Sequence, residues 1–209
     1  MKCCLMGFLL TVAIIQGYGQ IVVPMFPMAT IPEHGFLPGK KFRFYPTINK
    51  YDLGGIKLRV ELRDVRDSLK IERLDCSLME INNKSEFAGD YGAQIVYQYF
   101  QYLLPAAGVT LDSTSTDVLS VSLEALDNRL LGFGKITPHG LCQICVQWKD
   151  FSKCYCVDIT DKDPHSPIGP NAFVTRKTGT RVIQSAAIRE AIERLIIDLQ
   201  KVITRTSNS

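Results

Sequence analysis

The chain has 209 residues, of which 46% are hydrophobic, 22% charged and 9% aromatic. These fractions are typical of a globular domain and exclude disordered, collagen-like and coiled-coil proteins. The 24 Lys and Arg residues nearly balance the 21 Asp and Glu residues, and the net charge is +3. That charge is too small for a nucleic-acid-binding surface, so we expect no nucleic-acid partner.

Residues 1–19 have the layout of a secretory signal peptide. Lys2 precedes an apolar run from Leu5 to Ile15, and the small residues Gly17 and Gly19 precede the expected cleavage site. The run is about half the roughly 20 residues that span a bilayer as a helix, so we expect no integral membrane span in the mature chain. The alternatives are a buried N-terminal strand and an uncleaved anchor. The favoured location is secreted or periplasmic, including association with an outer membrane.

Residues 20–53 are rich in proline. Because proline removes backbone donors and fixes φ, we expect this segment to be an extended arm. This segment is interpreted either as a tether or as a docking segment for a partner protein. The docking interpretation depends on apolar residues that are unusual in a free linker. These candidate partner-binding residues are Ile21, Val22, Val23, Met25, Phe26 and Met28.

The remaining chain predicts one domain over residues 54–204 and a short tail over 205–209. Apolar and charged residues alternate from Ile56 to Arg63, which is typical of a half-buried strand. A weaker alternation predicts a second strand at 74–78, and a capped apolar stripe predicts a helix over 90–104. Four further strands and a final amphipathic helix follow, at 118–126, 129–136, 141–148, 153–159 and 182–203. We therefore expect an α+β fold, a mostly antiparallel sheet with two helices packed on one face.

Signal-peptide cleavage leaves five cysteines, so at least one thiol stays free or pairs with another molecule. If residue 148 pairs with residue 153 in a four-residue hairpin, Cys145 lies opposite Cys156, close enough for a disulfide. A two-residue hairpin connection is the alternative pairing. The Cys145–Cys156 pair is our disulfide candidate, and reduced, buried cysteines are the alternative.

Four thiolates, those of Cys142, Cys145, Cys154 and Cys156, could also hold a zinc ion. Both Cys pairs lie in strand-like runs that lack the tight turns of a zinc knuckle. The Cys-x2-Cys pair also lacks the following helix of thioredoxin-like redox sites. We therefore expect no metal and no cofactor, and a cysteine-centred metal-binding or redox protein remains the alternative.

Acid–base catalysis finds little support in the sequence. We expect each of His34, His139 and His165 in a loop that carries Pro or Gly, and none has a carboxylate or Cys at the spacing of a triad or metal site. Asp64 and Arg66 follow the first strand, where we interpret them as a solvated ion pair. We assign no catalytic residue. An enzyme with a dispersed site is a second alternative, and a deep pocket joining Asp64, Arg66 and a histidine would favour it.

The domain resembles the small α/β domain of YajG-like bacterial envelope lipoproteins, which have relatives among transport-auxiliary and TolB N-terminal-like modules. The matching features are IKLRVELRDVRD at 56–67, the Ala-Ala-Gly that closes a helix at 106–108, VLSVSLEAL at 118–126 and the amphipathic helix at 182–203. The chain departs from that pattern because no lipid-attachment cysteine follows its apolar segment. The resemblance implies an envelope assembly or scaffold protein with no catalytic residues.

Together these features predict an exported, non-enzymatic cell-envelope protein that acts in binding, assembly or as a scaffold. Its expected partner is another envelope or secreted protein, bound through the sheet edge or the apolar arm.

Overall fold

A computed structural model of the chain describes residues 51–81, 90–131, 137–163 and 176–207. The predicted signal peptide and nearly all of the predicted arm lie outside these ranges. The described elements, in chain order, are β1 (Lys57–Asp64), α2 (Arg66–Leu69), α3 (Asp90–Ala106), β2 (Thr110–Leu111), β3 (Val118–Leu131), β4 (Thr137–Trp148), β5 (Phe151–Thr160) and α4 (Arg176–Ser207).

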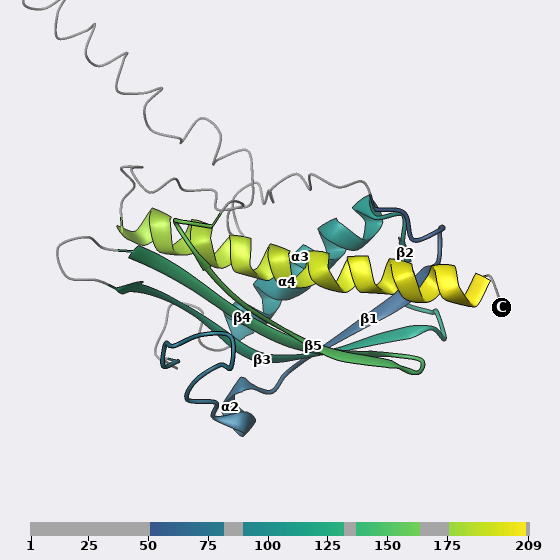
Figure 1. The fold of residues 1–209 in the computed structure, drawn as a ribbon. Coiled ribbons are helices and arrows are strands. Elements are labelled where there is room, and N and C mark those ends of the chain that lie inside the picture. Colours follow the sequence, from purple (N-terminus) through teal and green to yellow (C-terminus); the bar gives the residue numbers. More distant parts are fainter. Residues whose placement is uncertain (1–50, 82–89, 132–136, 164–175, 208–209) are drawn as a thin grey trace, which may run out of the picture.

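The strands form one five-stranded sheet with the order β2-β1-β3-β4-β5 (Figure 1). Strands β3, β4 and β5 pair antiparallel as a meander. Strand β1 lies parallel to both of its neighbours, β2 and β3. Parallel neighbours cannot be joined by a short hairpin, so the chain returns over one face of the sheet as α3 between β1 and β2. The predicted α+β fold class is confirmed, with some parallel pairing within a mostly antiparallel sheet.

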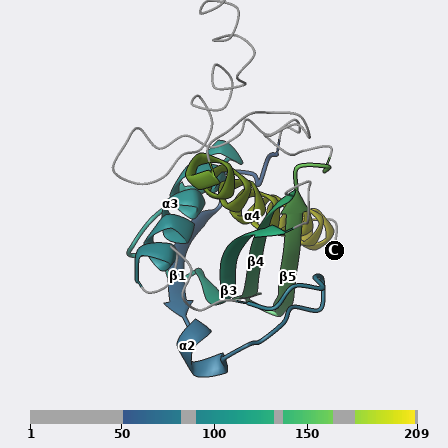
Figure 2. The same ribbon diagram turned by 90° about the vertical axis from the view of Figure 1, so that its left-hand side faces the viewer.

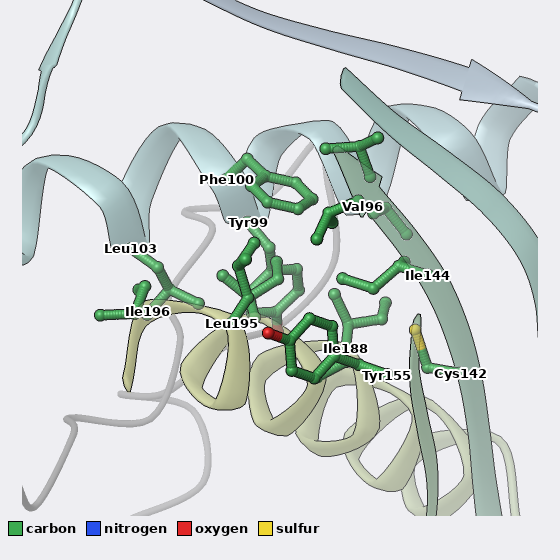
Figure 3. Packing of buried hydrophobic residues seen from close by; sticks show 14 of the residues in the cluster. Val96, Tyr99, Phe100, Leu103, Cys142, Ile144, Tyr155, Ile188, Leu195 and Ile196 are labelled. Atoms are coloured by element: carbon green, nitrogen blue, oxygen red, sulfur yellow. The ribbon is translucent and has the colours of Figure 1, made fainter. Parts of the chain in front are cut away.

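Both long helices pack on the same face of the sheet, while the short α2 lies on the other side (Figures 1 and 2). Helix α4 contacts β3, β4 and β5, and α3 contacts β1, β2 and α4. Figure 3 shows the core between these layers, where Tyr99 and Phe100 of α3 and Leu195 of α4 lie near Ile144 of β4. All four side chains are fully buried. Burial of such apolar stripes is the main source of helix stability in a folded domain.

The predicted strand at 74–78 is wrong. This segment consists of turns, with one isolated antiparallel bridge between Arg73 and Glu80. Leu74 and Met79 are buried against the sheet face opposite the long helices, whereas Leu78 is 94% exposed. The buried residues are thus five positions apart, which does not match the two-residue period of a strand. The alternation at 74, 76 and 78 therefore gives no strand.

Several predicted boundaries also differ from the structure. The strand expected at 118–126 continues to Leu131, so it takes in the start of the strand expected at 129–136. Helix α4 is longer at both ends than the predicted 182–203 helix, and it extends into the expected tail. Leu53, at the end of the expected arm, is fully buried, and its N–H donates to Ala107 O.

Candidate functional site

Most of the outer edge of β1 has no neighbouring strand among the described residues. Arg59 and Val65 donate their N–H groups to Asp117 and Leu123 of the β3 segment, so odd-numbered residues direct their backbone groups toward β3. Even-numbered residues face the other way, as shown by Leu58 O, which accepts from Asp112 N. Strand β2 has only two residues and pairs no further than Leu58.

The backbone N–H and C=O groups of Val60 and Leu62 therefore point toward an open sheet edge. No described residue forms a hydrogen bond with them on that side. Such unpaired groups are a template for the addition of another strand. Figure 2 shows β1 on the outer side of β3, beneath α3.

A cavity of about 430 Å³ lies at this edge. It is lined by the consecutive β1 residues 58–61, by α3 residues that include Tyr97 and Phe100, and by Leu111 at the end of β2 and Asp112 directly after it. Consecutive strand residues point to opposite sheet faces. A cavity lined by four of them in a row therefore opens at the edge of the strand and not on one face.

The rim of this cavity is both apolar and charged. Tyr97 is 38% exposed, and Arg59 and Glu61 form an exposed ion pair with an N–O distance of 2.8 Å. Hydrogen bonds from Thr114 lower the pKa of Asp112, so its carboxylate is charged at neutral pH. The fully buried Leu58 and Phe100 line the cavity beneath this rim, and an apolar base with a mixed rim suits an extended peptide that inserts alternate side chains.

The opposite edge of the sheet, β5, is partly occupied by the chain's own side chains. Arg194 of α4 donates to Cys156 O at 3.3 Å, and Thr160 N donates to the Asp163 carboxylate at 2.6 Å. Lys153 and Asp198 form a 2.6 Å ion pair between this strand and α4. Charged side chains of this kind reduce strand addition at an edge. Among the described residues, no such side-chain hydrogen bonds fill the edge of β1 at Val60 and Leu62.

The predicted Cys145–Cys156 disulfide is not the pairing in the structure. Cys145 is bonded to Cys154, and Cys156 is bonded to Cys76. The hairpin pairs Trp148 with Phe151 and so leaves only two loop residues. The first of these, Lys149, has the positive φ that such short hairpins require. This pairing moves the partner of Cys145 by two positions from the predicted one.

The four cysteines considered for zinc do not come together. Cys142 is free, and it is fully buried on the sheet face that packs against the helices. Burial raises the pKa of its thiol to about 12, which makes it unreactive. The Cys145–Cys154 disulfide lies on the opposite face, because residues three apart in a strand point to opposite sides.

A second cavity, of about 610 Å³, lies on the face opposite the helices. There Asp158 accepts a 2.6 Å hydrogen bond from Ser77 and lies 2.9 Å from His139 Nδ1. Its carboxylate thus separates the hydroxyl from the imidazole, so His139 does not contact Ser77 as a general base would. Asp64 and Arg66 pair with each other at 2.6 Å and line neither described cavity. Among the described residues, neither of these cavities therefore joins Asp64 and Arg66 with His139.

The other predicted site residues lie outside the described ranges. They are the six apolar arm residues of 21–28 and the histidines His34 and His165. The residues at the β1 edge were not predicted as a site from the sequence. The available signal was the polar run Asp112-Ser113-Thr114-Ser115, which ends β2 after two residues.

Comparisons with known proteins show a shared fold. No family model and no curated protein matches the sequence. A solved structure of protein XCC0632 from Xanthomonas campestris, of family DUF330, aligns with a TM-score of 0.51 and 10% identity, covering 80% of this chain and 95% of that one. A minor lipoprotein from Acinetobacter baumannii aligns with a TM-score of 0.40 and 12% identity over 70% and 94% of the two chains. An uncharacterized protein gives a TM-score of 0.33 at 11% identity, over 69% and 94%. At these identities the first alignment shows that the two chains share a fold.

Proposed function

We propose that the chain is an exported, non-enzymatic binding protein of the cell envelope that takes up an extended segment of another envelope or secreted protein at the open edge of β1. The observation that carries this proposal is the coincidence of unpaired backbone groups at Val60 and Leu62 with a cavity at the same edge. The binding mode is strand addition, in which main-chain hydrogen bonds give affinity and side-chain pockets give specificity.

In this proposal, the open edge of β1 and its cavity specify which groups the partner segment contributes. Its backbone pairs with Val60 and Leu62, which continues the ladder that β2 begins at Leu58. One apolar side chain of the segment enters the cavity between β1 and Tyr97. The exposed Arg59–Glu61 pair accommodates polar side chains on the other face of the added strand.

Two disulfides among the described residues support export, because disulfides persist mainly in oxidising compartments. None of the described helices is both long and apolar enough to cross a membrane. Together with the predicted signal peptide, these features favour a secreted, periplasmic or outer-membrane-associated protein. The scaffold role implied by the YajG-like resemblance and the contribution of arm residues 21–28 belong to this proposal as further predictions.

The proposal is tested with edge prolines and a displayed library of ten-residue peptides. Val60→Pro removes an N–H that points away from β3, so the β1–β3 pairing survives. The matched control is Ser152→Pro on the opposite edge, where the N–H points away from β4. We expect peptides selected on the wild-type protein to bind the control equally and Val60→Pro at least about tenfold more weakly.

Hydrogen exchange gives the second measurement. Bound peptide should slow exchange at the amides of Val60 and Leu62 and leave β5 unchanged. In cells, a photo-crosslinking amino acid at position 97 should capture an envelope or secreted protein that one at position 152 does not capture. Equal peptide binding by Val60→Pro, or protection at β5 in place of β1, would contradict the proposal.

A further inference from the structure

The two disulfides differ in what they hold together. Cys145–Cys154 joins residues that already face each other in the β4–β5 ladder, which runs from Trp148↔Phe151 to His139↔Thr160. Cys76–Cys156 connects residues 80 positions apart and fixes the segment before α3 to the sheet. The first therefore adds a constraint that the hairpin already supplies, and the second supplies one that no strand pairing replaces.

The surroundings of the disulfides differ in the same way. Cys156 packs against a buried cluster that includes Leu74 and Met79, and the neighbouring Ser77 hydroxyl donates to Asp158. Cys154 is exposed, and it lies on the edge strand β5 on the sheet face opposite the long helices. An incoming thiol can therefore reach Cys154 without displacing a core residue.

We propose that Cys145–Cys154 is a thiol–disulfide exchange site, opened by a dithiol donor and closed again by a disulfide, while Cys76–Cys156 keeps the domain folded. A donor thiolate bonds to Cys154 Sγ, and the Sγ–Sγ bond breaks. Cys145 then leaves with the electron pair and takes up a proton. The second donor thiol displaces Cys154, so two electrons and two protons pass from the donor to the pair, and the donor becomes a disulfide.

Glu124 lies beside both sulfurs of the pair. Its carboxylate oxygen, Cys145 Sγ and Cys154 Sγ lie within 4.8 Å of one another, and Gln143 holds the carboxylate with a 2.7 Å hydrogen bond. A fixed negative charge at this distance disfavours a second one on either sulfur. This environment suits a reversible switch better than a nucleophilic catalyst, which needs a stabilised thiolate.

The order of opening follows from accessibility. The sequence separations are 9 and 80 residues, but loop length acts on the entropy of the unfolded chain, whereas this exchange takes place in the folded domain. Cys154 is exposed, whereas Cys156 packs against the buried cluster. We therefore expect a range of dithiothreitol concentrations that opens Cys145–Cys154 in the mature protein and leaves Cys76–Cys156 intact.

The experiment traps thiols with N-ethylmaleimide and identifies the labelled peptides by mass spectrometry. Cys142 is an internal control, because its buried thiol becomes labelled only when the domain unfolds. The expected result is paired labelling of Cys145 and Cys154 with Cys142 protected and the circular dichroism spectrum unchanged. A Cys145→Ser/Cys154→Ser variant should fold normally and show no labelling in that range.

Two outcomes would overturn the proposal. In one, Cys76–Cys156 opens first or both disulfides open together. In the other, opening Cys145–Cys154 exposes Cys142, which would show that this link is needed for the fold.

Discussion

Gly140 of β4 lies directly against the backbone of α4, and we predict that Gly140→Ala strongly destabilises the domain. A Cβ atom at this position would lie 2.4 Å from the carbonyl oxygen of Ile183 and 2.7 Å from its carbonyl carbon. Ordinary contacts of a Cβ begin near 3.4 Å. Helix α4 would therefore have to move by about 1 Å, which a close-packed interior resists.

The displacement would also affect the next residues on both elements. Gln184 donates a buried 2.8 Å hydrogen bond to Leu141 O, directly beside the clash. Overpacking costs about 1–3 kcal/mol, and a buried polar group that loses its partner costs about 1–3 kcal/mol. We expect the free energy of unfolding to fall by about 3 kcal/mol or more, measured by urea denaturation followed by circular dichroism.

Gly55→Ala is the matched control. Gly55 has a φ of +70°, and a Cβ there would meet no atom within 4 Å. Its substitution therefore tests backbone strain alone, which costs about 1–2 kcal/mol. A loss for Gly140→Ala no larger than that for Gly55→Ala would refute the close approach of α4 to β4.

Removal of the Cys76–Cys156 disulfide by alanine substitution should lower the free energy of unfolding by about 4.5 kcal/mol. Removal of the Cys145–Cys154 disulfide should lower it by about 2.7 kcal/mol, because that disulfide closes a shorter loop. Equal losses in urea denaturation would contradict this prediction. Partial burial would raise the pKa of Asp198, but hydrogen bonds from Lys153, Lys201 and Tyr155 lower it to about 2. Since this folded-state pKa lies below the unfolded value, the stabilisation is complete above about pH 4 and is lost as the pH falls toward 2. Asp198→Asn should therefore cost about 1 kcal/mol at pH 7, after solvent screening, and progressively less as the pH falls through 2; a cost independent of pH would argue against the ion cluster. Leu53→Ala should cost about 2–5 kcal/mol, because its side chain is fully buried, and a cost below about 1 kcal/mol would place it outside the core.

The sequence predicts those parts of the fold that depend on local periodicity. The alternation from Ile56 to Arg63 predicts β1, and the apolar stripe of 182–203 predicts α4, because each pattern reports which face of one element is buried. Local periodicity does not predict which strands pair with β1. Its parallel pairing with β2 and β3 depends on contacts between residues about 50–60 positions apart, and β2 is too short to show a period.

The disulfide pairing of the cysteines, like the pairing of β1, cannot be predicted from local periodicity. The sequence predicts correctly that β4 and β5 form a hairpin, but the disulfide pairing depends on the turn length. A two-residue turn that begins at Lys149, which takes a positive φ without being glycine, places Cys145 opposite Cys154. The link between Cys76 and Cys156 depends on the folding of residues 65–81 onto the sheet, which no local pattern predicts.

The open edge of β1 arises from a local turn. After two residues of β2, Asp112 accepts hydrogen bonds from the backbone and hydroxyl of Thr114, and Ser115 reaches back to Lys57 O. The chain thereby leaves the edge of β1 and crosses to begin β3 on its other side. Longer pairing of β2 along β1 would have occupied Val60 and Leu62 and filled the cavity between β1 and α3. The turn that ends β2 therefore leaves Val60 and Leu62 without a neighbouring strand on this side among the described residues, and the proposed strand addition depends on it.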